Sequence, residues 1–156
     1  MAFDKAKTHI SKYGLEDRVS VFDVSSATVS LAALALGCDE AHIAKTMSCM
    51  NNENAILIVT AGDVKISNSK FKAKFHHKAT MINREHVESL IGHASGGVCP
   101  FGINDGVDVY LDESLKRFEY VYPACGSDNS AVKLNISELE KCSECKEWID
   151  VCVSKE

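Results

Sequence analysis

The segment 96–102, Gly-Gly-Val-Cys-Pro-Phe-Gly, has the composition of a ligand-binding loop. Glycine adopts backbone conformations closed to other residues, and proline fixes φ and has no N–H to donate. Such a run cannot form a regular helix or a central strand, so it predicts a shaped loop whose main-chain N–H groups can approach a ligand. Lys45, far upstream in the segment 43–46 (Ile-Ala-Lys-Thr), supplies a cation. Loop and lysine together predict a site for a carbonyl, carboxylate or phosphate group, although the same loop composition also occurs in purely structural turns.

The overall composition is that of a globular protein of one domain spanning residues 1–156. Hydrophobic residues make up 46% of the chain and charged residues 25%, and no repeat or Pro/Ser-rich linker divides it. The formal net charge of −5 argues against a protein that coats nucleic acid through bulk positive charge, but it permits a local basic patch.

The location of the protein is predicted from its N-terminus and its cysteines. The first residues lack an apolar signal region, and no apolar run approaches the roughly 20 residues of a membrane span. Seven cysteines, an odd number, are scattered along the chain rather than arranged as a dense disulfide framework. We therefore expect a cytoplasmic protein with reduced thiols and no membrane association.

Hydrophobic periodicity and capping residues predict helices and strands in mixed order. A helix over 29–36, capped by Ser25 or Ser26 and ended by Gly37, is followed by strands at 43–50 and 55–60. The remaining expected helices are 4–13, 68–76, one after Asn83, and one capped by Ser137; the remaining expected strands are 18–23, 64–66, 107–111, 118–122 and 131–136. Because the elements follow no strict βαβ rhythm, they favour an α+β fold with a mixed sheet that could close on itself.

Several short motifs recur in a characteristic order along most of the chain. They are Gly37-Cys38-Asp39-Glu40, the Lys45 segment, Gly62-Asp63, the 96–102 loop, the segment 109–114 and the turn at Gly126. In this order and spacing, roughly residues 3–142 resemble the YbaK/EbsC family, the prolyl-tRNA synthetase-associated editing domains. Lys45 falls on the lysine of that family, and Gly97 with Pro100 falls on its Gly-x-x-Pro loop.

The resemblance implies both a fold and an activity. The fold would be a mixed, largely antiparallel β-barrel-like sheet flanked by helices. The activity would be that of a free-standing trans-editing deacylase, which hydrolyses mischarged aminoacyl-tRNA, typically Cys- or Ala-tRNA(Pro), without a metal or cofactor. Its partners would be the acceptor end of aminoacyl-tRNA and, as a candidate, prolyl-tRNA synthetase.

Departures from the family pattern leave the removed amino acid open. Tyr122-Pro123 stands where the alanine-editing branch usually carries His-Pro. Ser127-Asp128 stands where the cysteine-editing branch usually carries a basic pair, and Cys99 replaces a common Ser or Thr.

Roles for the motif residues follow from ester chemistry together with the resemblance. We expect Lys45 to anchor the substrate, and N–H groups around Gly97 and Val98 to hold the ester carbonyl, since preorganised donors stabilise developing negative charge. The residues expected to line the aminoacyl pocket are Gly96, Val98, Cys99, Pro100, Phe101, Tyr122, Gly126 and Ser127. No nucleophile–base triad is recognisable, so we expect a water-mediated or substrate-assisted reaction. The competing interpretation of Lys45 is a lysine on an edge strand that reaches solvent.

Two further clusters have competing interpretations. Lys70, Lys72 and Lys74 could track acceptor-stem phosphates, or they could form the solvated face of a helix that buries two phenylalanines. Cys142 and Cys145 have zinc-like spacing, but no fourth ligand lies nearby, so no metal site is expected. On a continuing helix, Cys145 and Cys152 would instead share a face that packs on the core.

Two other classes of function remain open at the level of sequence. One is a non-catalytic module that binds tRNA or a synthetase, and the other is an ester or thioester hydrolase acting on small metabolites.

Overall fold

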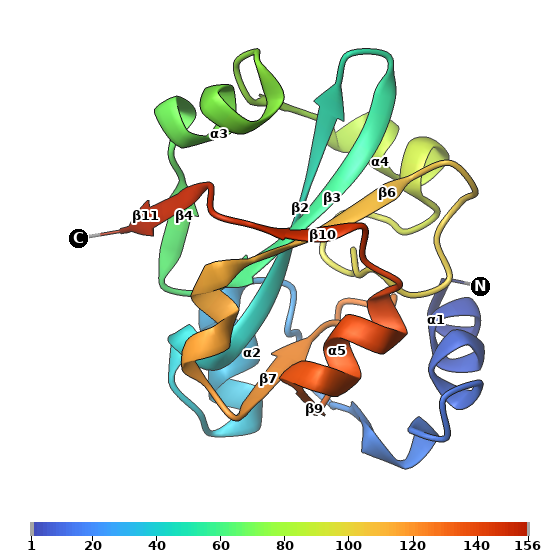
Figure 1. Cartoon of the computed structure of the whole chain (residues 1–156). Coiled ribbons are helices and arrows are strands. Elements are labelled where there is room, and N and C mark those ends of the chain that lie inside the picture. Colours follow the sequence, from blue (N-terminus) through green and yellow to red (C-terminus); the bar gives the residue numbers. More distant parts are fainter. Residues whose placement is uncertain (1, 156) are drawn as a thin grey trace.

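The computed structural model describes residues 2–155 and is built around a curled, mixed sheet (Figure 1). The strand order is β10-β6-β3-β2-β7-β9, with β5 pairing beside them on β2. The strands of this sheet are β2 (Ile43–Asn51), β3 (Asn54–Ala61), β5 (Thr80–Met81), β6 (Asp108–Asp112), β7 (Tyr120–Pro123), β9 (Leu134–Asn135) and β10 (Glu147–Ile149).

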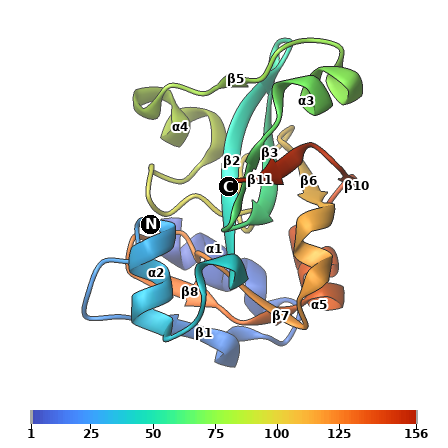
Figure 2. The ribbon, with the colours of Figure 1, turned by 90° about the vertical axis from the view of Figure 1, so that its left-hand side faces the viewer.

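Helices and two small sheets surround this framework (Figure 2). The helices are α1 (Ala2–Ser11), α2 (Val29–Leu36), α3 (Asn68–Phe75), α4 (Arg84–Ile91) and α5 (Ile136–Ser143), with short 3-10 turns at Glu16–Arg18, Glu40–His42 and Glu113–Arg117. The small sheets pair β1 (Val19–Val21) with β8 (Ser130–Val132) and β4 (Val64–Ile66) with β11 (Cys152–Ser154). In the part of the chain that the structure describes, no helix has the length and apolar content needed to cross a membrane.

The β2–β3 hairpin forms the centre of the molecule. The two strands pair from Ala44↔Ala61 to Asn51↔Asn54, and Asn52 occupies the tight turn with φ 59°. β2 and β6 pair with the two edges of β3, and both of its faces are buried by other parts of the chain, which explains its continuous apolar run Ile56–Val59. β2 in turn pairs with β3, β5 and β7, so it is an inner strand.

The predicted α+β fold class is confirmed. The sheet combines antiparallel pairs, such as β2–β3 and β7–β9, with parallel pairs, such as β2–β7 and β3–β6. It curls into a half-barrel flanked by helices. It remains open, with β10 and β9 at its two ends.

Several local predictions need correction. The side chain of Thr28, rather than Ser25 or Ser26, caps α2, and Asn135, rather than Ser137, caps α5 in a capping box with Glu138. The last helix ends at Ser143, so Cys145 and Cys152 do not share a helical face. The chain instead continues into β10 and β11, which pair with distant strands that the local sequence does not reveal.

A buried carboxylate ties the end of β6 to the C-terminal segment. Asp112 is 1% exposed, and its two oxygens accept hydrogen bonds from the backbone N–H groups of Ser114 (2.9 Å) and Val151 (3.0 Å). The first bond caps the 3-10 turn at 113–117, and the second fixes the chain between β10 and β11. Asp112 therefore has a structural role, and it does not line the pocket described below.

Replacing this carboxylate should destabilise the fold. We expect Asp112→Ala to lower the free energy of unfolding by about 1–3 kcal/mol, because it leaves two N–H groups without their acceptor. Asp105→Ala, at an exposed position, is the control and should change it by less than about 0.5 kcal/mol. Urea unfolding monitored by circular dichroism measures both; equal midpoints for the two variants would contradict this role.

Candidate active site

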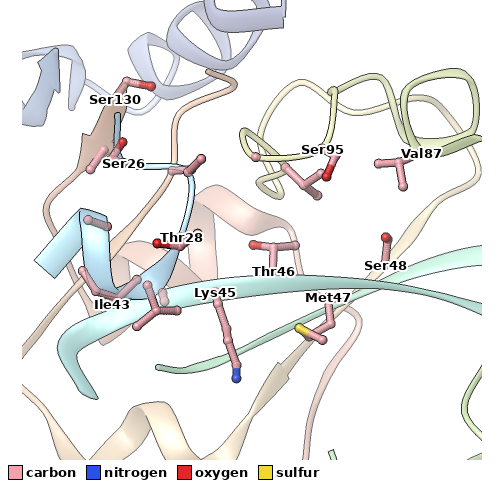
Figure 3. A pocket seen from close by; sticks show the side chains of 18 of the residues that line it. Ser26, Thr28, Ile43, Lys45, Thr46, Met47, Ser48, Val87, Ser95 and Ser130 are labelled. Carbon is pink, nitrogen blue, oxygen red and sulfur yellow. The ribbon is translucent and has the colours of Figure 1, made fainter. Parts of the chain in front are cut away.

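A pocket of about 310 Å³ lies over one face of β2 (Figure 3). Its other walls come from the chain leading into α2, from α4, from the loop at 95–98 and from β7 and β8. The cavity lies at the small end of the usual range for small-molecule sites, about 300–1,000 Å³. It can enclose a small chemical group but not a length of nucleic acid.

The alternation of β2 decides which side chains enter the pocket. Successive residues of a strand point to opposite faces, so Thr46 and Ser48 project into the cavity while Lys45 and Met47 project to the other side (Figure 3). Ser95 and Val87 face β2 from the opposite wall.

Hydroxyl groups dominate the polar lining. Besides Thr46 and Ser48, the pocket is lined by Ser26, Thr28, Ser95 and Ser130. The Thr28 hydroxyl accepts a hydrogen bond from the N–H of Leu31 and so caps α2, which fixes the chain at that wall. Ser130 shares a hydrogen bond of 2.6 Å with Ser127. By contrast, the hydroxyls of Ser26 and Thr46 are buried and have no hydrogen-bond partner among residues 2–155.

The charge of the lining is entirely positive. Among the described residues, no aspartate, glutamate, histidine or cysteine lines this pocket, and Arg84, at the start of α4, is the charged lining residue besides Lys45. Arg84 is exposed, and within residues 2–155 no ion pair or hydrogen bond engages its guanidinium. The pocket therefore provides hydroxyls and a free cation, but no carboxylate or imidazole for general-base chemistry.

Lys45 is half-buried on the other face of β2. Its ammonium donates a hydrogen bond to the carbonyl of Val64, so it links β2 to β4. Burial lowers the pKa of Lys45, and the nearby charge of Lys155 lowers it further. β2 is an inner strand in the sheet order, but at Lys45 it pairs with β3 alone, because β7 pairs only at 43–44 and β5 only at 49–50. The anchoring role of Lys45 stays a prediction, since its ammonium does not face the pocket here.

The predicted loop reaches the pocket only in part. Gly96 and Val98 line it, whereas the N–H of Gly97 donates to the carbonyl of Ala94 (3.0 Å). A Cβ on Gly97 would lie 2.7 Å from the backbone nitrogen of Ser127, so glycine is required for the loop to pack on the 126–127 turn. Among the backbone donors predicted to hold an ester carbonyl, the N–H of Val98 has no partner in the described chain, while that of Gly97 is occupied.

Cys99, Pro100 and Phe101 lie under the loop, away from the pocket lining. All three are buried, and the Cys99 sulfur is 3.5 Å from Nε2 of His93. Burial raises the pKa of the Cys99 thiol and lowers that of His93, so both stay neutral. The structure therefore keeps Cys99 in the core, outside the lining of this pocket.

The other predicted pocket residues divide similarly. Tyr122, on β7, lines the cavity. Gly126 and Ser127 do not line it. Gly126 has φ +83° and packs closely against Ala2, and the Ser127 hydroxyl shares a hydrogen bond with that of Ser130, which does line the pocket.

The basic helix α3 is engaged elsewhere. Lys70 pairs with Asp150 (3.0 Å) and Lys74 pairs with Glu147, whereas Lys72 is exposed. Phe71 and Phe75 are buried, as expected for a helix with one solvated face. α3 and α4 lie on different sides of the β2–β3 hairpin (Figures 1 and 2), so α3 does not border the pocket. RNA binding by these lysines remains a prediction.

The cysteines form no metal site that the structure reveals. All seven thiols are free, and the described residues contain no cluster of three or more His, Cys, Asp or Glu side chains arranged to hold a metal ion.

Sequence reasoning missed most of the pocket hydroxyls and Arg84. The alternation Lys45-Thr46-Met47-Ser48 does signal that lysine and hydroxyls face opposite sides, but it does not say which side is hollow. No local pattern marks Ser26 or Arg84, because the fold brings their segments to β2 from separate parts of the chain.

The burial of Cys99 predicts an unreactive thiol. In the native protein at pH 8, we expect iodoacetamide to modify the partly exposed Cys38 and Cys145 before Cys99, because only an accessible thiolate reacts. Peptide mass spectrometry after graded exposure measures the order. Preferential labelling of Cys99 in the folded protein would contradict its placement.

Comparison with known proteins agrees with this architecture. A solved structure assigned as a candidate trans-editing enzyme for prolyl-tRNA synthetase superposes with a TM-score of 0.87 at 23% identity, covering 98% of each chain. The structure of hypothetical protein APE2540 superposes with a TM-score of 0.79 at 22% identity, over 92% of this chain and 99% of the other. At these identities, the two matches show the shared fold.

Sequence comparison gives the family. The chain is 46% identical over 153 residues to the uncharacterized protein YwhH of Bacillus subtilis (strain 168), covering 97% of this chain and 98% of that protein. Residues 24–142, which include all the pocket walls, match the aminoacyl-tRNA editing domain. The motif resemblance is thus confirmed, and the chain belongs to the family of aminoacyl-tRNA editing domains of the YbaK/EbsC type.

Proposed function

We propose that this protein is a free-standing trans-editing deacylase that hydrolyses the ester of mischarged aminoacyl-tRNA. The observation that carries the proposal is the small pocket over β2, whose size admits an aminoacyl group while excluding the tRNA body. Membership of the editing family supports the same reaction class. Cys- and Ala-tRNA(Pro) are the substrates that the motif resemblance implies, and both carry small side chains.

The lining limits how the ester can be cleaved. No carboxylate or imidazole among the described lining residues is available to activate one of the pocket's serine or threonine hydroxyls, and no thiol lines it, so we assign the attack to water or to a group of the substrate itself. In the water route, the water oxygen bonds to the ester carbonyl carbon, the bond from that carbon to the ribose oxygen breaks, and a proton passes to the ribose oxygen. Free amino acid and deacylated tRNA result.

Backbone and cationic groups would position the substrate for this step. The unoccupied N–H of Val98 is suited to the ester carbonyl oxygen, where negative charge develops. Arg84 is suited to a phosphate of the acceptor end, because guanidinium binds phosphate oxygens in a fork of two hydrogen bonds. Lys45 is the second residue proposed to anchor the substrate. In this role its ammonium would give up the hydrogen bond to the Val64 carbonyl and donate to a phosphate oxygen instead.

The cellular setting belongs to the same proposal. The protein would act in the cytoplasm on the acceptor end of aminoacyl-tRNA, and prolyl-tRNA synthetase would be a natural partner. A synthetase pocket built for proline cannot strongly reject smaller amino acids, which creates the need for such an editor.

The direct test is ester loss from tRNA(Pro) charged with Ala, Cys, Ser, Thr or Pro. We expect selective deacylation of at least one mischarged species above the rate without enzyme. No loss across the panel would contradict the proposal and favour a non-catalytic binding module. Hydrolysis of small esters that excess tRNA does not inhibit would instead favour a metabolite esterase.

Two substitutions test the proposed anchors. We expect Arg84→Gln to raise KM about tenfold or more with little change in kcat, since a hydrogen bond to a charged group contributes about 1.5–3 kcal/mol. Lys45→Ala should also raise KM, and it should lower the urea midpoint because the Val64 bond is lost. Lys72→Gln, on the distant helix α3, is the control. An Arg84→Gln variant with the KM of the control would contradict the anchoring role of Arg84.

A further inference from the structure

Three hydroxyls on the pocket wall lack partners within the protein. Ser26 and Ser48 are each 8% exposed, and neither hydroxyl makes a hydrogen bond within the described chain. The Thr46 hydroxyl, between them on the pocket wall, is buried and equally unpartnered. We refer to Ser26, Thr46 and Ser48 as the hydroxyl cluster.

Most of the fully covered side-chain polar atoms that lack a hydrogen-bond partner in the described chain lie on this pocket wall. In residues 2–155 only three side-chain polar atoms that are themselves fully covered lack a partner, and two of them belong to Ser26 and Thr46; the Ser48 oxygen is not among these fully covered atoms. Burying a hydroxyl without a hydrogen bond costs free energy, and folded proteins seldom leave such groups unsatisfied. All three residues line the cavity, so a water molecule or a ligand group that enters it is the available partner for their hydroxyls.

The chemistry of the cluster defines what enters. A hydroxyl can both donate and accept, so the cluster matches an uncharged group that does the same. No acidic side chain lines the described pocket to hold a side-chain ammonium. Around the cluster the walls are apolar, formed by Val29, Ala32, Ile43, Val87 and Val98. A short aliphatic side chain that bears a hydroxyl fits both parts of the lining.

We infer that the pocket selects an aminoacyl group with a side-chain hydroxyl, serine or threonine, over alanine. This inference rests on the proposed deacylase function and names its substrate class. A site that hydrogen-bonds a substrate hydroxyl discriminates strongly against the analogue lacking it, because the site's own polar groups are then left unpaired. A cysteinyl group, whose thiol is only a weak hydrogen-bond donor, should be selected less strongly than a seryl group and more strongly than an alanyl group.

The experiment compares Ser- and Ala-charged forms of one tRNA(Pro). We expect the wild-type kcat/KM to be at least tenfold higher for the seryl ester. Thr46→Val preserves the shape of the side chain and removes its hydroxyl, so the preference should fall severalfold, and Ser26→Ala should do the same. Thr60→Val is the matched control: this buried threonine on β3 bonds the carbonyl of Ala61 outside the pocket, so the preference should persist.

A second measurement separates this inference from the proposed function. Calorimetry with adenosine carrying a 3′-linked seryl or alanyl amide, which cannot be hydrolysed, reports selectivity without turnover. The inference is supported if the wild type binds the seryl amide more tightly than the alanyl amide and Thr46→Val abolishes this difference. This result would stand even if no tRNA is deacylated and the proposed function fails. Equal binding of the two amides overturns the inference. If the protein does deacylate tRNA, the inference is also overturned when Thr46→Val leaves the ratio of kcat/KM for the seryl and alanyl esters unchanged.

Discussion

The structure depends on the burial of the β2–β3 hairpin at the centre of the sheet. β3 is covered on both faces, and β2 is held by pairing with three strands, so neither strand can shift its register without moving apolar side chains into solvent. This constraint fixes the alternation along β2. Thr46 and Ser48 consequently form a rigid pocket wall, while Lys45 is directed to the other face.

Around this rigid strand, the other walls are fixed by close backbone contacts. Gly97 packs directly on the Gly126–Ser127 turn, where a methyl group would collide with main-chain atoms. The N–H of Ser26 donates to the carbonyl of Asp128 at 2.6 Å, so the same turn also places the chain that enters α2. The glycine motifs therefore act mainly by joining three loops around the pocket, and fewer of their atoms face a substrate than their sequence suggested.

Local sequence predicted the features that local physics controls. The bounds of α2 were predicted because Gly37 takes the left-handed conformation that ends the helix, and strands at 43–50 and 55–60 followed from two apolar runs around a turn. The fold class and family followed from motif order. β10 and β11 were missed because their strand partners, β6 and β4, lie far away in the sequence.

The candidate site was predictable only in part. Gly96, Val98 and Tyr122 do line the pocket, but Cys99 and Phe101 belong to the core. Sequence cannot tell which residues of a glycine-rich loop point inward, because that depends on what the loop packs against. Arg84 and the hydroxyl cluster were missed for the same reason: each acquires its role from segments that meet only in the folded chain.

We propose that the cavity over β2 binds the aminoacylated end of tRNA. The most direct measurement maps backbone amide chemical shifts as a tRNA(Pro) acceptor-stem mimic with a stable aminoacyl amide at its 3′ end is added. We expect the largest changes to cluster at 26–29, 44–48, 84–87 and 95–98, the segments that form the pocket walls. Changes confined to α3 and the C-terminal strands, with these segments unaffected, would contradict it.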